Sequence, residues 1–184
     1  MKVSKVLLIA QAIGMYLMHL PLYVYIFFFG TPLGESIPVE VNQGLLIAFL
    51  VLSALVFPIC ILNTVFPIIS IFKGDYNPSK TTMIVKLALI PWYIMNYVMC
   101  GFIVAGCLNP FLMLAIPIII CIASVVTYIY MVTTSLYDVA FFIRGLIKKR
   151  IKVSAFYIVS LIFLFIFCLD IAGGILFYNA SKDE

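Results

Sequence analysis

Charged residues are scarce in this chain: they form 10% of its 184 residues, whereas 66% are hydrophobic. A water-soluble domain of this size could not keep so much apolar surface away from water. Long polar stretches are also missing, so no separate soluble module is expected and residues 1–184 are predicted to form a single domain. The apolar residues occur in long runs between short polar breaks, which is typical of membrane-spanning helices.

Histidine is nearly absent, and the cysteines lack the spacing of a metal or redox centre. His19 is the one histidine, and the five cysteines include no CxxC pair, which argues against a zinc site, a metalloprotease or a thiol-disulfide centre. No GxSxG, phosphate-binding or dinucleotide-binding glycine motif occurs. Asp170 is the only acid deep within an apolar run, so a pair of facing catalytic acids is missing. The sequence predicts a non-enzymatic protein without catalytic residues, metal or cofactor.

The apolar runs that are long enough to cross a bilayer as helices are residues 4–29, 44–72, 82–106, 110–133 and 153–178. They predict an all-α, polytopic membrane helix bundle with about five transmembrane helices. In the third run, Lys86 lies near the start, where its long side chain can extend to the membrane interface.

Positive charges gather in alternate loops. Lys2 and Lys5, then Lys73 and Lys80, then the segment from Arg144 to Lys152 all fall on one side if the runs alternate across the membrane. Because cytoplasmic loops carry the excess of lysine and arginine, this pattern predicts a cytoplasmic N-terminus and an external C-terminus. The net charge is only +4 and sits in short loops, so the expected partner is a lipid bilayer and nucleic-acid binding is not expected.

Residues 137–152 differ from the other runs because apolar and basic residues alternate at helical spacing. This pattern predicts a basic amphipathic helix on an anionic leaflet. The alternative is that the segment merely continues the fourth span into the cytosol. The basic residues of the predicted lipid-facing surface are Arg144, Lys148, Lys149, Arg150 and Lys152.

Polar residues within the runs fall into two layers when depth is counted at about 1.5 Å per residue from each span's centre. His19, Asn96 and Asp170 form the outer layer, and Gln11 and Asn63 form the inner pair. A histidine near an aspartate inside a membrane could form a proton or solute site. The alternative is that these residues only hydrogen-bond neighbouring helices to one another.

The last run combines one acid with two adjacent glycines. An acid facing lipid is costly, so Asp170 is expected to turn this helix inward. Gly173 and Gly174 follow about one turn later, and they would allow another helix to come close.

Three segments carry a resemblance to a known group: KLALIPWYIMNYVMCGFIVAGCLNP (residues 86–110), TSLYD (134–138) and LDIAGG (169–174). The C-terminal half is similar to a family of small, uncharacterised bacterial multi-span membrane proteins. The resemblance implies the bacterial cytoplasmic membrane and supplies no activity or site.

Three hypotheses about function follow. The first is an accessory subunit of a transport system or a small oligomeric carrier, which implies a protein partner or self-association. The second is a membrane scaffold or regulatory protein that binds lipid or a partner through its basic helix. The third is a lipid-modifying enzyme in which His19 and Asp170 act together.

Overall fold

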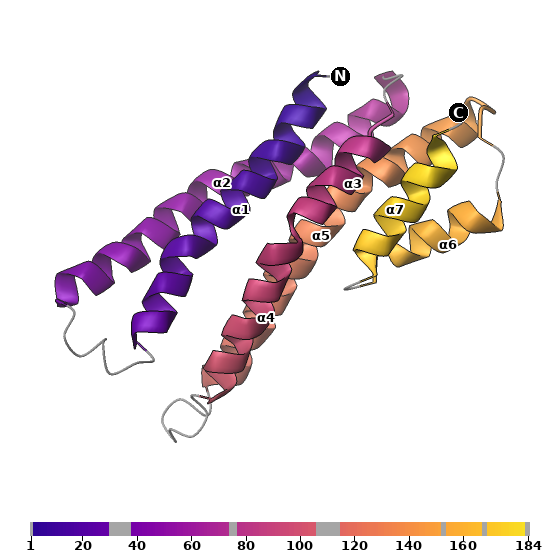
Figure 1. Ribbon diagram of the computed structural model, residues 1–184. Coiled ribbons are helices and arrows are strands. Elements are labelled where there is room, and N and C mark those ends of the chain that lie inside the picture. The colour runs from indigo at the N-terminus through magenta and orange to yellow at the C-terminus, as the bar shows by residue number, and fades with distance from the viewer. Residues whose placement is uncertain are drawn as a thin grey trace.

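The computed structural model describes residues 2–29, 38–73, 77–105, 115–151, 154–166 and 169–182 (Figure 1). Within these ranges the chain is all-helical. The helices are α1 (Lys2–Phe29), α2 (Val39–Lys73), α3 (Ser79–Ala88), α4 (Ile90–Ala105), α5 (Ala115–Ile147), α6 (Ala155–Phe163) and α7 (Asp170–Ser181).

Four helical segments of the described residues are long and apolar enough to cross a membrane: Val3–Tyr25, Gln43–Phe72, Ser79–Val104 and Ile120–Ile147. The third consists of α3 and α4, which are separated only at Leu89. Pro91 accounts for this break, because proline has no N–H to donate to the preceding turn and its ring crowds the carbonyl four residues earlier. Helix α2 is the least covered of the four, since only 11% of its most apolar window is buried.

The last apolar run does not form the single helix from Val153 to Tyr178 that the sequence predicts. It is divided into α6 and α7, which pack antiparallel to each other (Figure 1). The Tyr157 hydroxyl, near the start of α6, donates to the carbonyl of Ala180, near the end of α7, at 2.7 Å. The break is held from outside, because the Ser135 hydroxyl of α5 donates to the carbonyl of Leu164 at the end of α6.

This hairpin also changes where the chain ends. The sequence predicts termini at opposite ends of the bundle, but the structure places the start of α1 and the end of α7 at the same end (Figure 1). There Asn63 of α2 donates to the Leu7 carbonyl of α1, and Asn77 before α3 donates to the Ser181 carbonyl of α7. The prediction of opposite ends is wrong because the last run turns back instead of continuing.

Helix α5 continues without a break to Ile147, so the basic segment begins as an extension of the preceding helix and is not a separate amphipathic helix. The helix ends where Lys149 adopts a left-handed conformation with φ of 54°. The Arg150 N–H then donates to the Gly145 carbonyl at 2.9 Å, and the Ile151 side chain packs directly on Gly145. This hydrogen bond and apolar contact fold the chain back onto α5.

Two groups of buried apolar side chains form the core. The larger lies between α1, α2, α3, α4 and α5 and includes Leu8, Met15, Trp92 and Tyr130. The smaller lies around the hairpin and includes Ile151, Tyr157, Leu164 and Phe177. Polar side chains that are equally buried lie between and within these groups, and they define the candidate site.

Candidate functional site

A buried ion pair joins α3 to the C-terminal hairpin. The Lys86 Nζ lies 3.2 Å from Oδ2 of Asp170, and each side chain is only 1% exposed. Nζ also donates to the Ser135 hydroxyl of α5 at 2.7 Å. Lys86 is the eighth residue of the candidate span Ser79–Val104, about 10 Å along the helix at 1.5 Å per residue. The prediction that Lys86 extends to an interface is therefore wrong: its charge is turned into the bundle, where Asp170 compensates it.

The two adjacent glycines of α7 make room for this arrangement on two sides. A Cβ at Gly173 would lie 2.7 Å from the backbone nitrogen of Leu164, so glycine at 173 lets α7 approach α6. A Cβ at Gly174 would lie 2.9 Å from Cδ of Lys86, so glycine at 174 leaves space for the lysine side chain. The close approach expected at these glycines occurs toward α6 and α3.

A second carboxylate lies beside the same lysine. Asp138 of α5 is fully buried, and its Oδ1 accepts a hydrogen bond of 2.7 Å from the Thr82 hydroxyl, one turn before Lys86 on α3. Asp138 is close enough to interact electrostatically with Lys86, whereas its Oδ2 has no hydrogen-bond partner among the described residues. We call Thr82, Lys86, Ser135, Asp138 and Asp170 the charged cluster.

The charged cluster contains one ammonium group and two carboxylates. The hydrogen bonds and ion pairs of the described residues bring no second cation to it. A buried carboxylate without a compensating cation is costly, and such a group normally takes up a proton or binds a cation. The cluster is therefore a place where a proton can be held inside the bundle.

His19 and Asn96 lie elsewhere, in an aromatic environment. The ring of His19 is 5.1 Å from that of Trp92 and 5.7 Å from that of Tyr23, and its Nδ1 is 2.9 Å from the Met15 carbonyl oxygen. The Tyr23 hydroxyl donates to Oδ1 of Asn96 at 2.6 Å. Tyr23 thus connects His19 and Asn96, but no hydrogen bond or ion pair among the described residues connects either to Asp170. The depth expected for Asp170 assumes an unbroken helix, whereas the structure makes Asp170 the first residue of α7 and pairs it with Lys86.

The inner polar pair meets directly. Asn63 donates to Oε1 of Gln11 at 2.7 Å, and Gln11 donates to the Thr133 hydroxyl at 2.7 Å. The Tyr137 hydroxyl completes the group by donating to Oδ1 of Asn63 at 2.7 Å. Gln11 and Asn63 are 0% exposed, so this network joins α1, α2 and α5 without access to solvent.

The predicted basic surface is only partly present. Lys148, Lys149 and Arg150 are exposed at the end of α5, and Lys152 lies outside the described residues. Arg144 does not belong to this surface, because it is 5% exposed and donates to the Ser70 carbonyl of α2 at 3.3 Å. Its position on α5 turns it toward α2 instead of outward.

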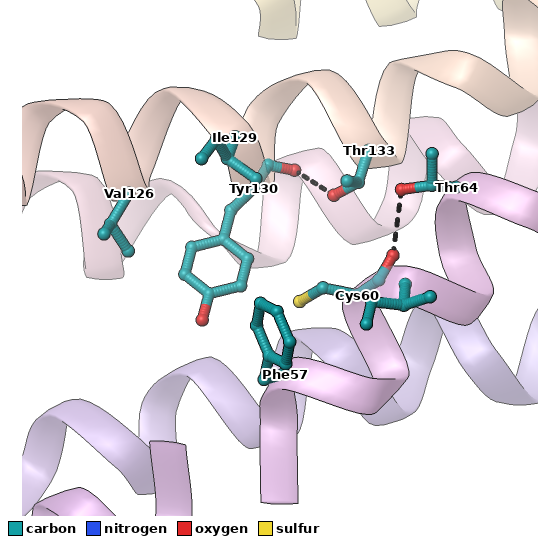
Figure 2. Close-up of a pocket in the computed structure, with 8 residues that line it drawn as sticks. Phe57, Cys60, Thr64, Val126, Ile129, Tyr130 and Thr133 are labelled. Atoms are coloured by element: carbon teal, nitrogen blue, oxygen red, sulfur yellow. Dashed lines mark hydrogen bonds between the residues drawn. The ribbon is translucent and has the colours of Figure 1, made fainter. Parts of the chain in front are cut away.

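A cavity of about 220 Å³ lies between α2 and α5. Figure 2 shows the rings of Phe57 and Tyr130 and the sulfur of Cys60 directed into this space. The Thr64 and Thr133 hydroxyls at its edge donate to carbonyls of their own helices, Cys60 and Tyr130 respectively. The cavity lining is therefore apolar, and it contains none of the charged cluster.

Sequence reasoning missed Thr82, Ser135 and Asp138, and it placed Lys86 wrongly. The sequence contains one signal for this cluster: a lysine and two acids occur in apolar surroundings, where buried opposite charges are expected to pair. Among the described residues, no group of three or more histidine, cysteine or acidic side chains is arranged to hold a metal ion.

The described residues form an all-helical fold that contains four helical segments long and apolar enough to cross a membrane, and a buried ion pair joins these segments to a C-terminal helical hairpin. The chain belongs to the family of unknown function DUF6652, whose family model matches residues 7–183. The match covers almost the whole chain and not only its C-terminal half. No curated protein and no solved structure matches the chain.

Proposed function

We propose that this chain is a non-enzymatic, multi-spanning membrane protein that moves protons as part of a transport process. It acts either as an accessory subunit of a transport system or as a small oligomeric carrier. Placement in a bilayer is supported by the large apolar side chains that point outward from α2. Leu50, Leu55 and Phe72, for example, are each at least 63% exposed. In water this surface would be unfavourable, whereas lipid chains solvate it.

In the proposed topology both termini are cytoplasmic. Lys5, Lys80 and Lys148 lie at the end of the bundle that holds the start of α1, the start of α3 and the end of α5. Because cytoplasmic loops carry an excess of lysine and arginine, we assign that end of the bundle to the cytoplasm. The α6–α7 hairpin enters from this side and returns to it. Backbone groups inside a membrane need partners within the protein, and the Leu164 carbonyl at the end of α6 has one in the Ser135 hydroxyl. We place the protein in the cell membrane, and the resemblance described above favours a bacterial cytoplasmic membrane.

The observation that carries this proposal is the composition of the charged cluster: Lys86 is paired with Asp170 while Asp138 carries a second carboxylate. An ion pair that only stabilises a fold is replaceable by apolar side chains of similar size, often at no cost. Charged groups inside membrane helices mark ion and proton pathways by default. Asp138, the carboxylate that is not paired with Lys86, is the group that holds the proton.

The hairpin is the element that proton binding would affect. Asp170 is the first residue of α7, so its charge is stabilised both by Lys86 and by the positive end of the helix dipole. An ionised Asp138 also attracts the ammonium group of Lys86, whereas a proton on Asp138 leaves Asp170 as the one counterion of Lys86 in the charged cluster. The ion pair between α3 and α7 therefore changes in strength with the proton on Asp138, while the Ser79 and Ser181 hydroxyls, 2.7 Å apart, keep the two helices joined. Broken helices of this kind surround the binding sites of many transporters.

Four spans and one hairpin form a small bundle, so a partner or a second copy is needed to enclose a path. Helix α2 offers the surface for this association, because only 11% of its most apolar window is covered by the rest of the chain. Native mass spectrometry of the protein extracted from its own membrane distinguishes the small oligomeric carrier from the accessory subunit. A homo-oligomer supports the carrier, and a complex with a second membrane protein supports the subunit.

Proton movement is measured with purified full-length protein in phosphatidylcholine liposomes that contain a pH-sensitive dye. A potassium diffusion potential, negative inside, drives protons inward. The wild-type protein is expected to acidify the interior faster than protein-free liposomes do, and Asp138→Asn and Asp170→Asn are each expected to abolish most of the difference. Lys80→Gln, which removes an exposed charge from the same helix as Lys86, serves as the control. Equal acidification with and without the protein would remove the carrier version.

A further inference from the structure

A cluster of aromatic rings surrounds His19 within the bundle, apart from the charged cluster. The ring of Trp92 lies 5.1 Å from that of His19 and 6.4 Å from that of Tyr130, and the ring of Phe49 lies 6.4 Å from that of His19. Trp92 is 0% exposed, and it lies near the middle of the candidate span Ser79–Val104. Its indole N–H therefore reaches neither bulk water nor lipid headgroups.

Two buried N–H groups of α4 have no hydrogen-bond partner among the described residues. They are Nε1 of Trp92 and Nδ2 of Asn96. Residues 92 and 96 are one helical turn apart, so both side chains leave the same face of α4. The side-chain oxygen of Asn96 is already used, because it accepts from the Tyr23 hydroxyl. Inside a membrane a donor without an acceptor is costly, so the two groups need an acceptor that the described residues do not supply.

The ring of His19 adds an acceptor beside these donors. Its Nδ1 lies 2.9 Å from the Met15 carbonyl oxygen, and a carbonyl only accepts, so Nδ1 carries the proton. In the neutral ring Nε2 is then an acceptor, and no hydrogen bond or ion pair among the described residues occupies it. The ring contacts Trp92 directly, and Tyr23 connects it to Asn96. Two donors and one acceptor thus lie around one place in the bundle.

We propose that Trp92, Asn96 and His19 bind the hydroxyl group of a small uncharged molecule. A hydroxyl has one O–H to donate and two lone pairs that accept, which matches one acceptor and two donors. Among the described residues, no hydrogen bond or ion pair joins a charged side chain to these three, so an ionic ligand would be buried without compensation. The aromatic rings suit the apolar part of such a molecule. Water and a small alcohol share this chemistry. The site is separate from the charged cluster, so it does not depend on the proton movement proposed above.

The experiment uses the indole N–H of Trp92 as its probe. Trp92 is the only tryptophan in the chain, so isotopically labelled full-length protein gives a single indole N–H signal by NMR. An amine-oxide detergent keeps other hydroxyl groups away. Bound water is expected to give a nuclear Overhauser contact between the indole proton and water. A bound alcohol is expected to shift the indole signal in a saturable way when glycerol is added. No response to either water or glycerol, or a glycerol shift that acetone reproduces without an O–H to donate, would overturn the proposal.

Variants assign the response to these side chains. Asn96→Leu removes one donor, and His19→Phe removes the acceptor and keeps a ring. Each is expected to weaken glycerol binding about three- to tenfold, or to reduce the water contact, because one hydrogen bond is lost. Tyr97→Phe removes an exposed hydroxyl next to Asn96 and is the control, expected to leave the indole signal unchanged. Tyr23→Phe removes the hydroxyl that binds Asn96, and the water contact should persist in it. Wild-type responses in both Asn96→Leu and His19→Phe, or loss of the water contact in Tyr23→Phe, would overturn the proposal.

Discussion

The side chain of Lys86 passes over Gly174 to reach the carboxylate of Asp170. A Cβ at residue 174 would lie 2.9 Å from Cδ of Lys86, and Nζ of the lysine lies 3.2 Å from Oδ2 of Asp170. Residues 170 and 174 are one helical turn apart, so they lie on the same face of α7. That face supplies both the space for the lysine and the charge that compensates it.

Loss of either member of the pair is expected to destabilise the protein. Lys86→Met should lower the free energy of unfolding by about 3–5 kcal/mol, because two carboxylates are then buried without a cation, and Asp170→Asn should lower it less, because Asp138 still attracts the ammonium group. The double variant Lys86→Met/Asp170→Leu should cost much less than the sum of Lys86→Met and Asp170→Leu. A double-mutant cycle by denaturant unfolding in detergent measures this coupling. Strict additivity would show that the two groups do not interact energetically.

Alanine at the two glycines of α7 is expected to have unequal effects. Gly173→Ala would place a methyl group 2.7 Å from the backbone nitrogen of Leu164, which cannot move aside, so a loss of about 1–3 kcal/mol is expected. Gly174→Ala meets the flexible Lys86 side chain and should cost less. Gly101→Ala meets nothing within 4 Å and should stabilise α4 by up to about 1 kcal/mol. Melting temperatures of the three variants give the order directly.

The two termini are expected on the same side of the membrane. Green fluorescent protein fused after residue 184 should fluoresce, and alkaline phosphatase fused at the same point should be inactive, because both report a cytoplasmic C-terminus. Alkaline phosphatase fused after Ala105, at the end of α4, should be active and provides the control. Phosphatase activity at the C-terminus would instead show that the last run crosses the membrane.

The inner polar network should depend most on its central residue. Asn63→Leu removes the donor to Gln11 and the acceptor for Tyr137, so a loss of about 2 kcal/mol is expected. Tyr137→Phe removes one of these bonds and should cost about half as much. Thr64→Val, on the same helix as Asn63, breaks only a bond to the Cys60 carbonyl and is the matched control. A loss with Asn63→Leu no greater than with Thr64→Val would contradict this order.

The left-handed residue at the end of α5 gives a further prediction. Lys149 has φ of 54°, which costs less for glycine than for any side chain. Lys149→Gly should therefore raise the free energy of unfolding by a few tenths to about 1 kcal/mol, and Lys149→Val should lower it. Hydrogen exchange at the Arg150 and Ile151 amides, which bond to Gly145, should slow in the first variant and accelerate in the second.

The parts of the fold that can be predicted from the sequence are those that follow from long apolar runs. Gln11 and Asn63 were assigned to one depth by counting along their helices, and the structure joins them because α1 and α2 are both unbroken through these residues. The same count fails for Asp170. No proline or glycine marks the break between Leu164 and Leu169, and the contacts that hold it come from Ser135, distant in sequence.

Arg144 and Lys86 show a second limit of sequence patterns. Each occupies a position at which a long basic side chain could extend to an aqueous interface, and that is where the pattern places it. The structure turns both inward: Arg144 toward a carbonyl of α2 and Lys86 toward Asp170. These contacts depend on how helices pack, which hydrophobic periodicity does not specify.

The separation of Lys86 and Asp170 in the chain has a consequence for biosynthesis. Asp170 follows Lys86 by 84 residues. At a translation rate of ~5–20 residues per second, the lysine leaves the ribosome roughly 4 to 17 seconds before its partner. During that interval Lys86 lacks its ion-pair partner, and Asp138, 52 residues after the lysine, is the first carboxylate of the charged cluster to follow it. A transcript that ends before codon 170 would leave the ion pair permanently incomplete.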